Sequence, residues 1–223
     1  TRPDDRLRLD PQVEDLKVLI ISILHRWGIS YSSNKYPVGH SHDFLGENYV
    51  TDVGEECRHN MEDWNPGYGH VLFANIKRLV EPVSRGLLVS RDDPDYPPLC
   101  DACDETHAQG GVVLWCHDGD GMESAVAAAL GKMDALNLFD PIPTVGYDYW
   151  YRLLNCGFKI PASSGTDWFI CDSNRVYVFL EGNFSYDAWL EGLKMGRTFI
   201  TNTPALFLSV NGRMVGDTIE LKG

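Results

Sequence analysis

Runs of apolar residues alternate with polar, glycine-rich stretches along most of the chain. Residues 17–24 are almost continuously apolar, which predicts a strand buried on both faces. Asp10 and Pro11 in front of this strand predict a short helix with an aspartate N-cap and a proline at its first position. Residues 28–48 show little periodicity and are expected to form a long loop.

The same reasoning predicts the later elements. Strands are expected at residues 49–53, 70–76, 112–116, 135–139 and 159–163, with residues 55–69 as a polar connection. Helices are expected at residues 99–109, 123–132, 147–156 and 186–195. The last part is mostly β, with strands at residues 175–180, 199–201 and 206–210 and a tight turn at Asn211-Gly212. Repeated alternation of strand and helix predicts an α/β fold with a parallel sheet or barrel, whose ligands bind at the carboxyl ends of the strands.

The composition narrows the range of functions. The chain has 223 residues, of which 43% are apolar, so a folded domain with a sizeable core is expected. Its 19 basic and 32 acidic residues give a formal net charge of −13, which argues against binding to nucleic acid or to an anionic membrane. No apolar run is long enough to predict a membrane span. The six cysteines do not form a dense disulfide framework.

The start of the chain leaves its location in the cell open. The first six residues contain no apolar signal-peptide core, and the chain does not begin with methionine. We therefore expect a processed or excised piece of a longer product. Cytoplasmic and secreted locations both remain open.

A histidine or a carboxylate stands at one end of five predicted strands. In chain order, these residues are His25, Glu55 or Glu56, His70, His117 and Asp167. Histidine nitrogens combined with carboxylate oxygens suit zinc, iron or manganese. The 14 residues from Glu56 to His70 and the 47 from His70 to His117 are far longer spacings than those of a zinc finger. They fit ligands that converge from separate strands.

Each of these residues also has a simpler interpretation. A single histidine at a strand end is more often a surface or hydrogen-bonded residue, and Asp167 could form an Asx-turn. Glu55 and Glu56 compete for the same role. His40 and His42 could share a metal ion from an extended segment, although no apolar strand flanks them. The coincidence of five strand ends favours a metal site over five unrelated residues.

Arginines and aromatic residues add candidates for substrate binding. Arg58 and Arg197 could hold a phosphate or carboxylate with the bidentate fork of the guanidinium group, or could form ordinary salt bridges in this acidic chain. Aromatic residues cluster in the two long loops, at Trp27, Tyr31, Tyr36, Trp64 and Tyr68. They could line a pocket or simply anchor the loops.

Several segments of the chain resemble the PHP (polymerase and histidinol phosphatase) superfamily. They are Gly54-Glu-Glu-Cys-Arg58 and residues 69–76, 108–117 and 151–167. Residues 174–178 and 189–202 are similar to its carbaryl-hydrolase-like branch, often called CehA/McbA, and the whole resemblance covers roughly residues 12–215. It implies a distorted (β/α)₇ TIM-like barrel with a two- or three-metal centre. Members hydrolyse phosphoesters, and this branch includes ester or carbamate hydrolysis.

The resemblance also implies a ligand set. Glu56 matches the metal-bridging glutamate, while His70, His117 and Asp167 match further ligands. His25 matches a histidine that ends an early strand, although Leu24 replaces the aspartate that usually precedes it. The family's histidine two residues after the Asp167 position is Phe169 here.

The opening His-x-His of the family is not found before Lys17. We therefore expect an N-terminally incomplete barrel over residues 1–180, or a replacement of the missing pair by His40 and His42. Residues 181–223 are expected to form a helix and a β-hairpin that lead into a C-terminal β domain.

These observations predict a metal-dependent hydrolase with a small-molecule substrate and two divalent ions (zinc, manganese or iron). Its oligomeric state stays open, with a homo-oligomer as one option. The alternative is a non-catalytic module with a degenerate metal site that binds a carbohydrate or a cell-surface ligand through its aromatic loops. A structural zinc protein is disfavoured because the candidate ligands are rich in carboxylates and the cysteines are not paired for it.

Overall fold

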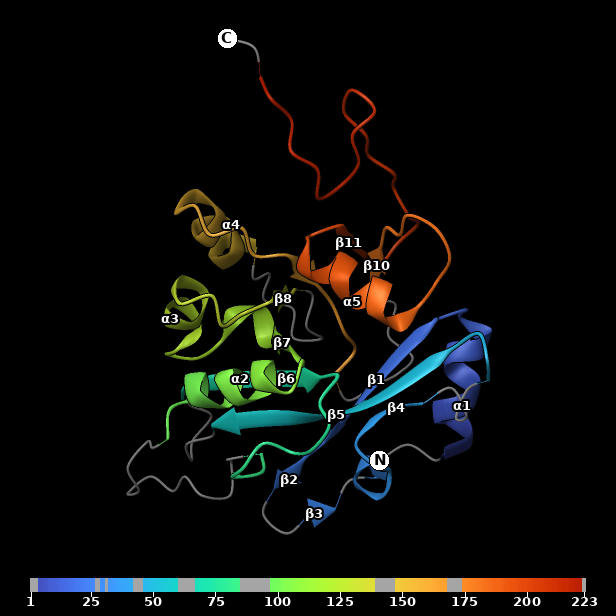
Figure 1. Cartoon of the computed structure of the whole chain (residues 1–223), viewed down its shortest axis with the longest axis vertical. Helices are drawn as coiled ribbons and strands as arrows, with labels where there is room; N and C mark the ends of the chain where they lie inside the picture. Colours follow the sequence, from blue (N-terminus) through green and yellow to red (C-terminus); the bar gives the residue numbers. More distant parts are fainter. Residues whose placement is uncertain are drawn as a thin grey trace.

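One curled sheet with helices on both faces forms the body of the protein in the computed structural model (Figure 1). The structure describes residues 4–26, 29–30, 32–41, 46–59, 67–84, 97–138, 147–167 and 174–221. The sheet curls like part of a barrel, which agrees with the expected α/β class and with a distorted barrel at this coarser level. Closure into a full (β/α)₇ barrel stays a prediction, as does a domain boundary at residue 180.

The main sheet is mixed, whereas a parallel sheet was expected. Seven strands of the described residues form it, in the order β1 (Val18–Ile23), β5 (Val50–His59), β6 (Gly69–Ala74), β7 (Val112–Trp115), β8 (Ala135–Asn137) and β9 (Ala162–Ser163), with β4 (Gly39–Ser41) paired to β5. The β1–β5, β7–β8 and β8–β9 pairs are parallel, but β6 runs antiparallel to both β5 and β7. No helix separates β5 from β6 among the described residues, so this connection does not need the crossover that a parallel pair requires.

Strand β5 is longer than the sequence pattern predicted. The segment expected as a polar connection from Glu55 continues the strand to His59, where β5 pairs with β6. Within it, Cys57 is fully buried on one face, while Glu56 and Arg58 share the opposite face. The strand was not predicted beyond Val53 because polar residues occupy one of its faces, where a buried strand usually has apolar side chains.

Three helices cover one face of the sheet, and all three were predicted. They are α2 (Leu99–Ala108), α3 (Ser124–Ala129) and α4 (Tyr147–Asn155). Their buried residues join a core around Phe73 and Trp115, both of which have no exposed surface. The strand expected at residues 159–163 is shorter, because only the two residues of β9 pair with β8.

A fourth predicted helix covers the opposite face. Helix α5 (Tyr186–Lys194) accompanies an antiparallel pair of strands, β10 (Arg175–Val178) and β11 (Thr198–Thr201). Leu190 and Leu193 of α5 pack with Val50 of β5 and Leu114 of β7. Ser185 caps the helix by accepting a hydrogen bond from the Ala188 N–H at 3.1 Å.

The two ends of the chain differ from the predictions. Helix α1 (Asp4–Val13) begins before Asp10 and contains Pro11, because Leu7 is buried and extends the packed face of the helix toward the N-terminus. The expected strand at residues 206–210 does not form. Phe207 is 81% exposed, and among the described residues only a bridge from Val210 to Arg213 pairs there, around the predicted Asn211-Gly212 turn. An apolar segment forms a strand only where a neighbouring strand is available to pair with it, and the sequence pattern does not show whether one is.

Short elements occupy part of the loop expected at residues 28–48. They are β3 (Ile29–Ser30), which pairs with β2 (His25–Arg26), the 3₁₀ helix η1 (Ser32–Lys35) and β4. The aromatic candidates Trp27, Tyr31 and Trp64 lie outside the described residues. Within the part of the chain that is described, no helix combines the length and apolarity needed to cross a bilayer.

A buried carboxylate joins α5 to the sheet. Asp52 of β5 is fully buried, and its Oδ2 accepts hydrogen bonds of 2.6 Å from the Tyr186 hydroxyl and from the Asn75 N–H. Burial raises the pKa of Asp52, although the two hydrogen bonds partly oppose this shift. The folded protein therefore holds a proton on Asp52 at pH values where the unfolded chain has already released it.

This raised pKa predicts that ionisation of Asp52 lowers stability as the pH rises from about 4 through the folded-state pKa. The variant Asp52→Asn keeps an acceptor oxygen for Tyr186 and cannot ionise. We expect it to gain stability relative to the wild type at pH 8 and to differ little at pH 4, measured by urea unfolding. The exposed Asp187→Asn on α5 is the control. An equal difference at both pH values would contradict the assignment.

Candidate metal centre

Polar side chains at the ends of three neighbouring strands come together because β6 runs opposite to its two neighbours. Glu56 and Arg58 lie near the end of β5, and Arg58 pairs in register with His70 near the start of β6. His117 follows the end of β7, where the Cys116 N–H donates to the His70 carbonyl oxygen at 2.9 Å. The start of β6 therefore lies beside the ends of β5 and β7.

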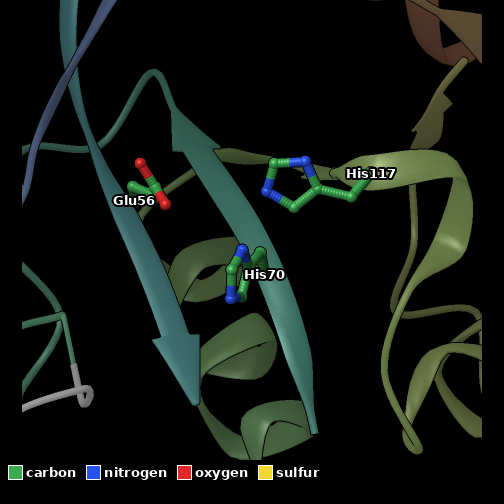
Figure 2. A group of neighbouring side chains, drawn as sticks. All are labelled: Glu56, His70 and His117. Atoms are coloured by element: carbon green, nitrogen blue, oxygen red, sulfur yellow. The ribbon is translucent and has the colours of Figure 1, made fainter. Parts of the chain in front are cut away.

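Glu56, His70 and His117 form a compact group of metal-ligating side chains, which point into a common space in Figure 2. Each offers one ligand atom, and these atoms all lie within 4.8 Å of one another. The imidazole rings of His70 and His117 have centroids 4.7 Å apart and meet edge to face. Two imidazoles and one carboxylate are a donor set known from catalytic zinc and non-haem iron sites. The residues therefore fit a divalent metal ion.

The structure separates the roles of the two adjacent glutamates. Glu55 is fully buried on the opposite face of β5, where its two carboxylate oxygens accept hydrogen bonds of 2.7 Å from the Val80 and Ser84 N–H groups. Glu56 faces the group of potential ligands and is only partly buried. Glu55 therefore holds the chain after β6 in place and is not directed toward the metal-ligating group.

The backbone at His117 is held in an unusual conformation. His117 and Asp118 have φ values of 52° and 56°, in the left-handed region that residues with a Cβ seldom adopt. Such strain is often found at functional sites. Burial, together with the positive charge of Arg58, lowers the pKa of His117 to about 4. The imidazole is therefore neutral near pH 7 and can offer a lone pair to a metal ion.

Glycines allow the loop after β7 to lie against the start of β6. The Met122 and Glu123 N–H groups donate to the carbonyl oxygens of Gly67 and Tyr68 at 3.0 and 3.1 Å. A Cβ at Gly121, which has a φ of 109°, would overlap the backbone at Gly69. This close contact fixes His117 beside His70. The role of these glycines was not predicted from the sequence.

Asp167 and His25 lie outside the three-residue group. Asp167 lines a cavity together with Glu56 and His117, and it also has a left-handed φ of 49°. Removal from water and the negative charge of Glu56 raise the pKa of Asp167 to about 7, although Arg58 partly opposes the shift. His25 is exposed, and its backbone N–H donates to the Ser84 hydroxyl at 3.1 Å.

The two candidate arginines have different surroundings. Arg58 is only 4% exposed, and its Nη1 lies 3.3 Å from Glu56 Oε1. The Nε and Nη2 atoms of Arg58 make no hydrogen bond with the described residues. Arg197 belongs to the segment before β11, and its Nη2 lies 3.7 Å from Glu181 Oε1. Of the two, only Arg58 is in contact with the metal-ligating group.

A cavity of about 630 Å³ extends from Glu56, His117 and Asp167 into the space between β1 and α5. Sequence reasoning did not single out two residues on its wall, Asn137 and Ser164, which follow the pattern of polar residues at strand ends. Asn137 ends β8, and Ser164 follows β9. They were missed because the search was for imidazoles and carboxylates.

The described residues contain one group suited to a metal ion, and it has three members. His40 lies on β4 opposite Asp52, and its ring centroid is 5.2 Å from that of Tyr186. Strand β4 runs antiparallel to β5, so the chain after His40 leads away from the edge that carries Glu56. His42 lies outside the described residues, and a contribution of this pair stays untested.

Comparisons with known proteins show similarity at the level of fold. No family model matches the chain, and no curated protein matches its sequence. The crystal structure of PsfC from Pseudomonas syringae PB-5123 is similar, with a TM-score of 0.53 and 14% identity over 89% of this chain and 82% of that chain. At this identity, the match indicates a shared fold.

A second solved structure is a two-domain protein from Bacteroides vulgatus ATCC 8482 that contains a predicted PHP-like metal-dependent phosphoesterase. It matches with a TM-score of 0.48 and 16% identity, over 69% of this chain and 45% of that chain. This chain therefore spans less than half of the two-domain protein.

The adjacent glutamates predict two opposite phenotypes. Glu56→Gln is expected to weaken zinc or manganese binding more than about 100-fold, because it removes a carboxylate ligand, while its amide oxygen remains an acceptor for Arg58 and limits the loss of stability. Glu55→Gln is expected to keep metal binding and to lose about 2–4 kcal/mol of stability, because a buried amide replaces an oxygen that accepts a backbone N–H. Isothermal titration with each metal and urea unfolding measure the two effects. Equal effects of both variants on metal affinity would contradict the division of roles.

Proposed function

We propose that the chain is a metal-dependent hydrolase in which Glu56, His70 and His117 hold a divalent ion. The supporting observation is that three ligand atoms converge within 4.8 Å of one another, with Glu56 and His117 on the wall of a cavity of about 630 Å³. Protein cavities of roughly 300–1,000 Å³ commonly bind small molecules. The proposed substrate is a small ester, carbamate or phosphoester.

The residues around the group would support such a reaction. The chemistry that a divalent ion supplies when bound is Lewis acidity, which includes lowering the pKa of a coordinated water toward neutral. His117 is neutral near pH 7, so no proton has to leave it before it binds a metal ion. Arg58 offsets part of the negative charge that Glu56 and Asp167 place at the site. The cavity beside the group would keep bulk water away from a bound substrate.

The wider ligand set belongs to the same proposal. We assign Asp167 as a ligand of a second ion because it shares the cavity wall with Glu56 and its pKa responds to the Glu56 charge. His25 is proposed as a further ligand on the sequence resemblance alone. Arg58 and Arg197 retain a substrate-binding role only as sequence-based proposals, because neither is among the residues that line the cavity.

The class of hydrolase follows from the sequence motifs. Residues 54–58, 69–76, 108–117 and 151–167 support assignment to the PHP superfamily. Residues 174–178 and 189–202 support the carbaryl-hydrolase-like CehA/McbA branch. Both assignments are proposals.

The test combines metal content with hydrolysis by the same protein. Metal-loaded protein is expected to hydrolyse members of a p-nitrophenyl ester and phosphate panel, to lose activity with a chelator and to regain it with zinc or manganese. His117→Ala is expected to lose both bound metal and more than about 100-fold in rate, since it removes one of three ligands. Elemental analysis and initial rates measure these effects.

His107→Ala is the matched control. This histidine lies on α2, and its Nε2 is 2.8 Å from Asp134 Oδ2, outside the proposed site. It should keep metal content and rate. Full activity and full metal content in His117→Ala would overturn the proposal. Absence of bound metal, together with folding that a chelator does not affect, would favour the non-catalytic binding module instead.

A further inference from the structure

The cavity beside the metal-ligating group has a larger apolar than polar surface. Val18 and Ile20 of β1, Leu72 of β6 and Leu114 of β7 contribute to it from the sheet. Helix α5 contributes Trp189 from the opposite side. Only a ligand with substantial apolar surface would replace water favourably along these walls.

Charge on the cavity wall disfavours an anionic ligand. Two basic side chains of the described residues line the cavity, and both are paired with an acid: Lys17 Nζ lies 2.7 Å from Asp15 Oδ1, and Arg175 Nη2 lies 2.9 Å from Glu14 Oε2. Glu56 and Asp167 add negative charge at the end of the cavity that carries the metal-ligating group. Arg58 is not among the lining residues. Away from the metal-ligating group, the described walls therefore offer an anionic ligand no unpaired basic side chain.

Two uncharged polar residues, Asn137 and Ser164, also line the cavity. Asn137 Oδ1 and Ser164 Oγ are buried and make no hydrogen bond with the described residues. The other end of the Asn137 amide makes only a long contact, 3.9 Å from Nδ2 to Cys116 Sγ. Buried polar atoms without partners are rare, because each one loses its hydrogen bonds to water on folding. A ligand in the cavity could supply these missing partners after small side-chain rotations.

We propose that the cavity binds an uncharged, largely apolar ester or amide, and that Asn137 and Ser164 are positioning residues for its neutral polar group. Ser164 Oγ donates a hydrogen bond to a carbonyl oxygen, while Asn137 Oδ1 accepts one from an N–H or O–H of the ligand. The apolar part extends between β1 and α5. As a statement about substrate class, this inference rests on the proposed hydrolase function and selects among its substrates.

The first experiment measures binding without requiring metal or catalysis. The full chain is titrated with neutral N-phenyl-1-naphthylamine and with its sulfonated analogue 1-anilinonaphthalene-8-sulfonate, and fluorescence reports binding. We expect saturable one-site binding of the neutral probe, at least tenfold tighter than that of the anion. Ile20→Trp should weaken the neutral probe at least tenfold by filling the cavity, whereas Val126→Trp on the exposed side of α3 should not. If circular dichroism shows that Ile20→Trp does not fold, Leu72→Phe replaces it.

Equal affinity for the two probes, or neutral-probe binding that no cavity variant weakens, would overturn the inference. These outcomes leave the proposed hydrolase function untouched, since neither depends on a metal ion.

The second experiment uses the metal-loaded protein and compares p-nitrophenyl acetate, butyrate and hexanoate with p-nitrophenyl phosphate. Burial of each added methylene should raise kcat/KM about fourfold until the cavity is filled. Asn137→Leu should raise KM for the hexanoate at least fivefold with kcat changed less than twofold, and Asn155→Leu on the exposed end of α4 is the control. A phosphate preference would overturn the substrate class and leave the hydrolase proposal standing. Neutral-probe binding without any hydrolysis would overturn the hydrolase proposal and leave the apolar cavity standing.

Discussion

The antiparallel ladder formed by β5, β6 and β7 is the constraint on which the site depends. Glu56 lies near the end of β5, His70 near the start of β6, and His117 after the end of β7. If β6 ran parallel to its neighbours, His70 would take the place of Phe73 near the other end of the strand, about 10 Å away at roughly 3.3 Å per residue. The ligand atoms instead lie within 4.8 Å of one another. One reversal of chain direction therefore creates the candidate metal centre.

The same arrangement brings together several features that are unfavourable for the stability of the fold. His117, Asp118 and Asp167 all have left-handed backbone conformations, and burial together with the negative charge of Glu56 raises the pKa of Asp167. Stability comes from elsewhere, because Glu55 holds two backbone N–H groups and Trp115 and Leu193 are fully buried in the two cores. A divalent ion would neutralise the opposed carboxylates, which is why we interpret the cluster as a binding site.

The sequence predicted elements well where burial alone determines the pattern. The helices at residues 99–109 and 186–195 and the strand at 112–116 are confirmed within one or two residues, because their apolar spacing matches a helix or a buried strand. The pattern failed at β5 beyond Val53, where the inward face is polar. The direction of β6 was also missed, since apolar spacing does not encode which way a strand runs. The candidate ligands could be named without this knowledge because each stands at a strand end, but their grouping required the topology.

Alternate residues of strand β5 have different roles, because one face of the strand packs into the fold and the other faces the candidate site. Glu55 and Cys57 face the helices on one side, and Glu56 and Arg58 face the site on the other. A shift of one residue in register would exchange the two sets, burying Glu56 where Glu55 binds backbone N–H groups and removing a ligand from the site. Gly54 opposes such a shift, because any Cβ there would overlap the Phe73 carbonyl, so only glycine allows β6 to end against β5 at this point. The register that stabilises the fold is therefore the one that directs Glu56 toward His70 and His117, and neither arrangement can change without the other.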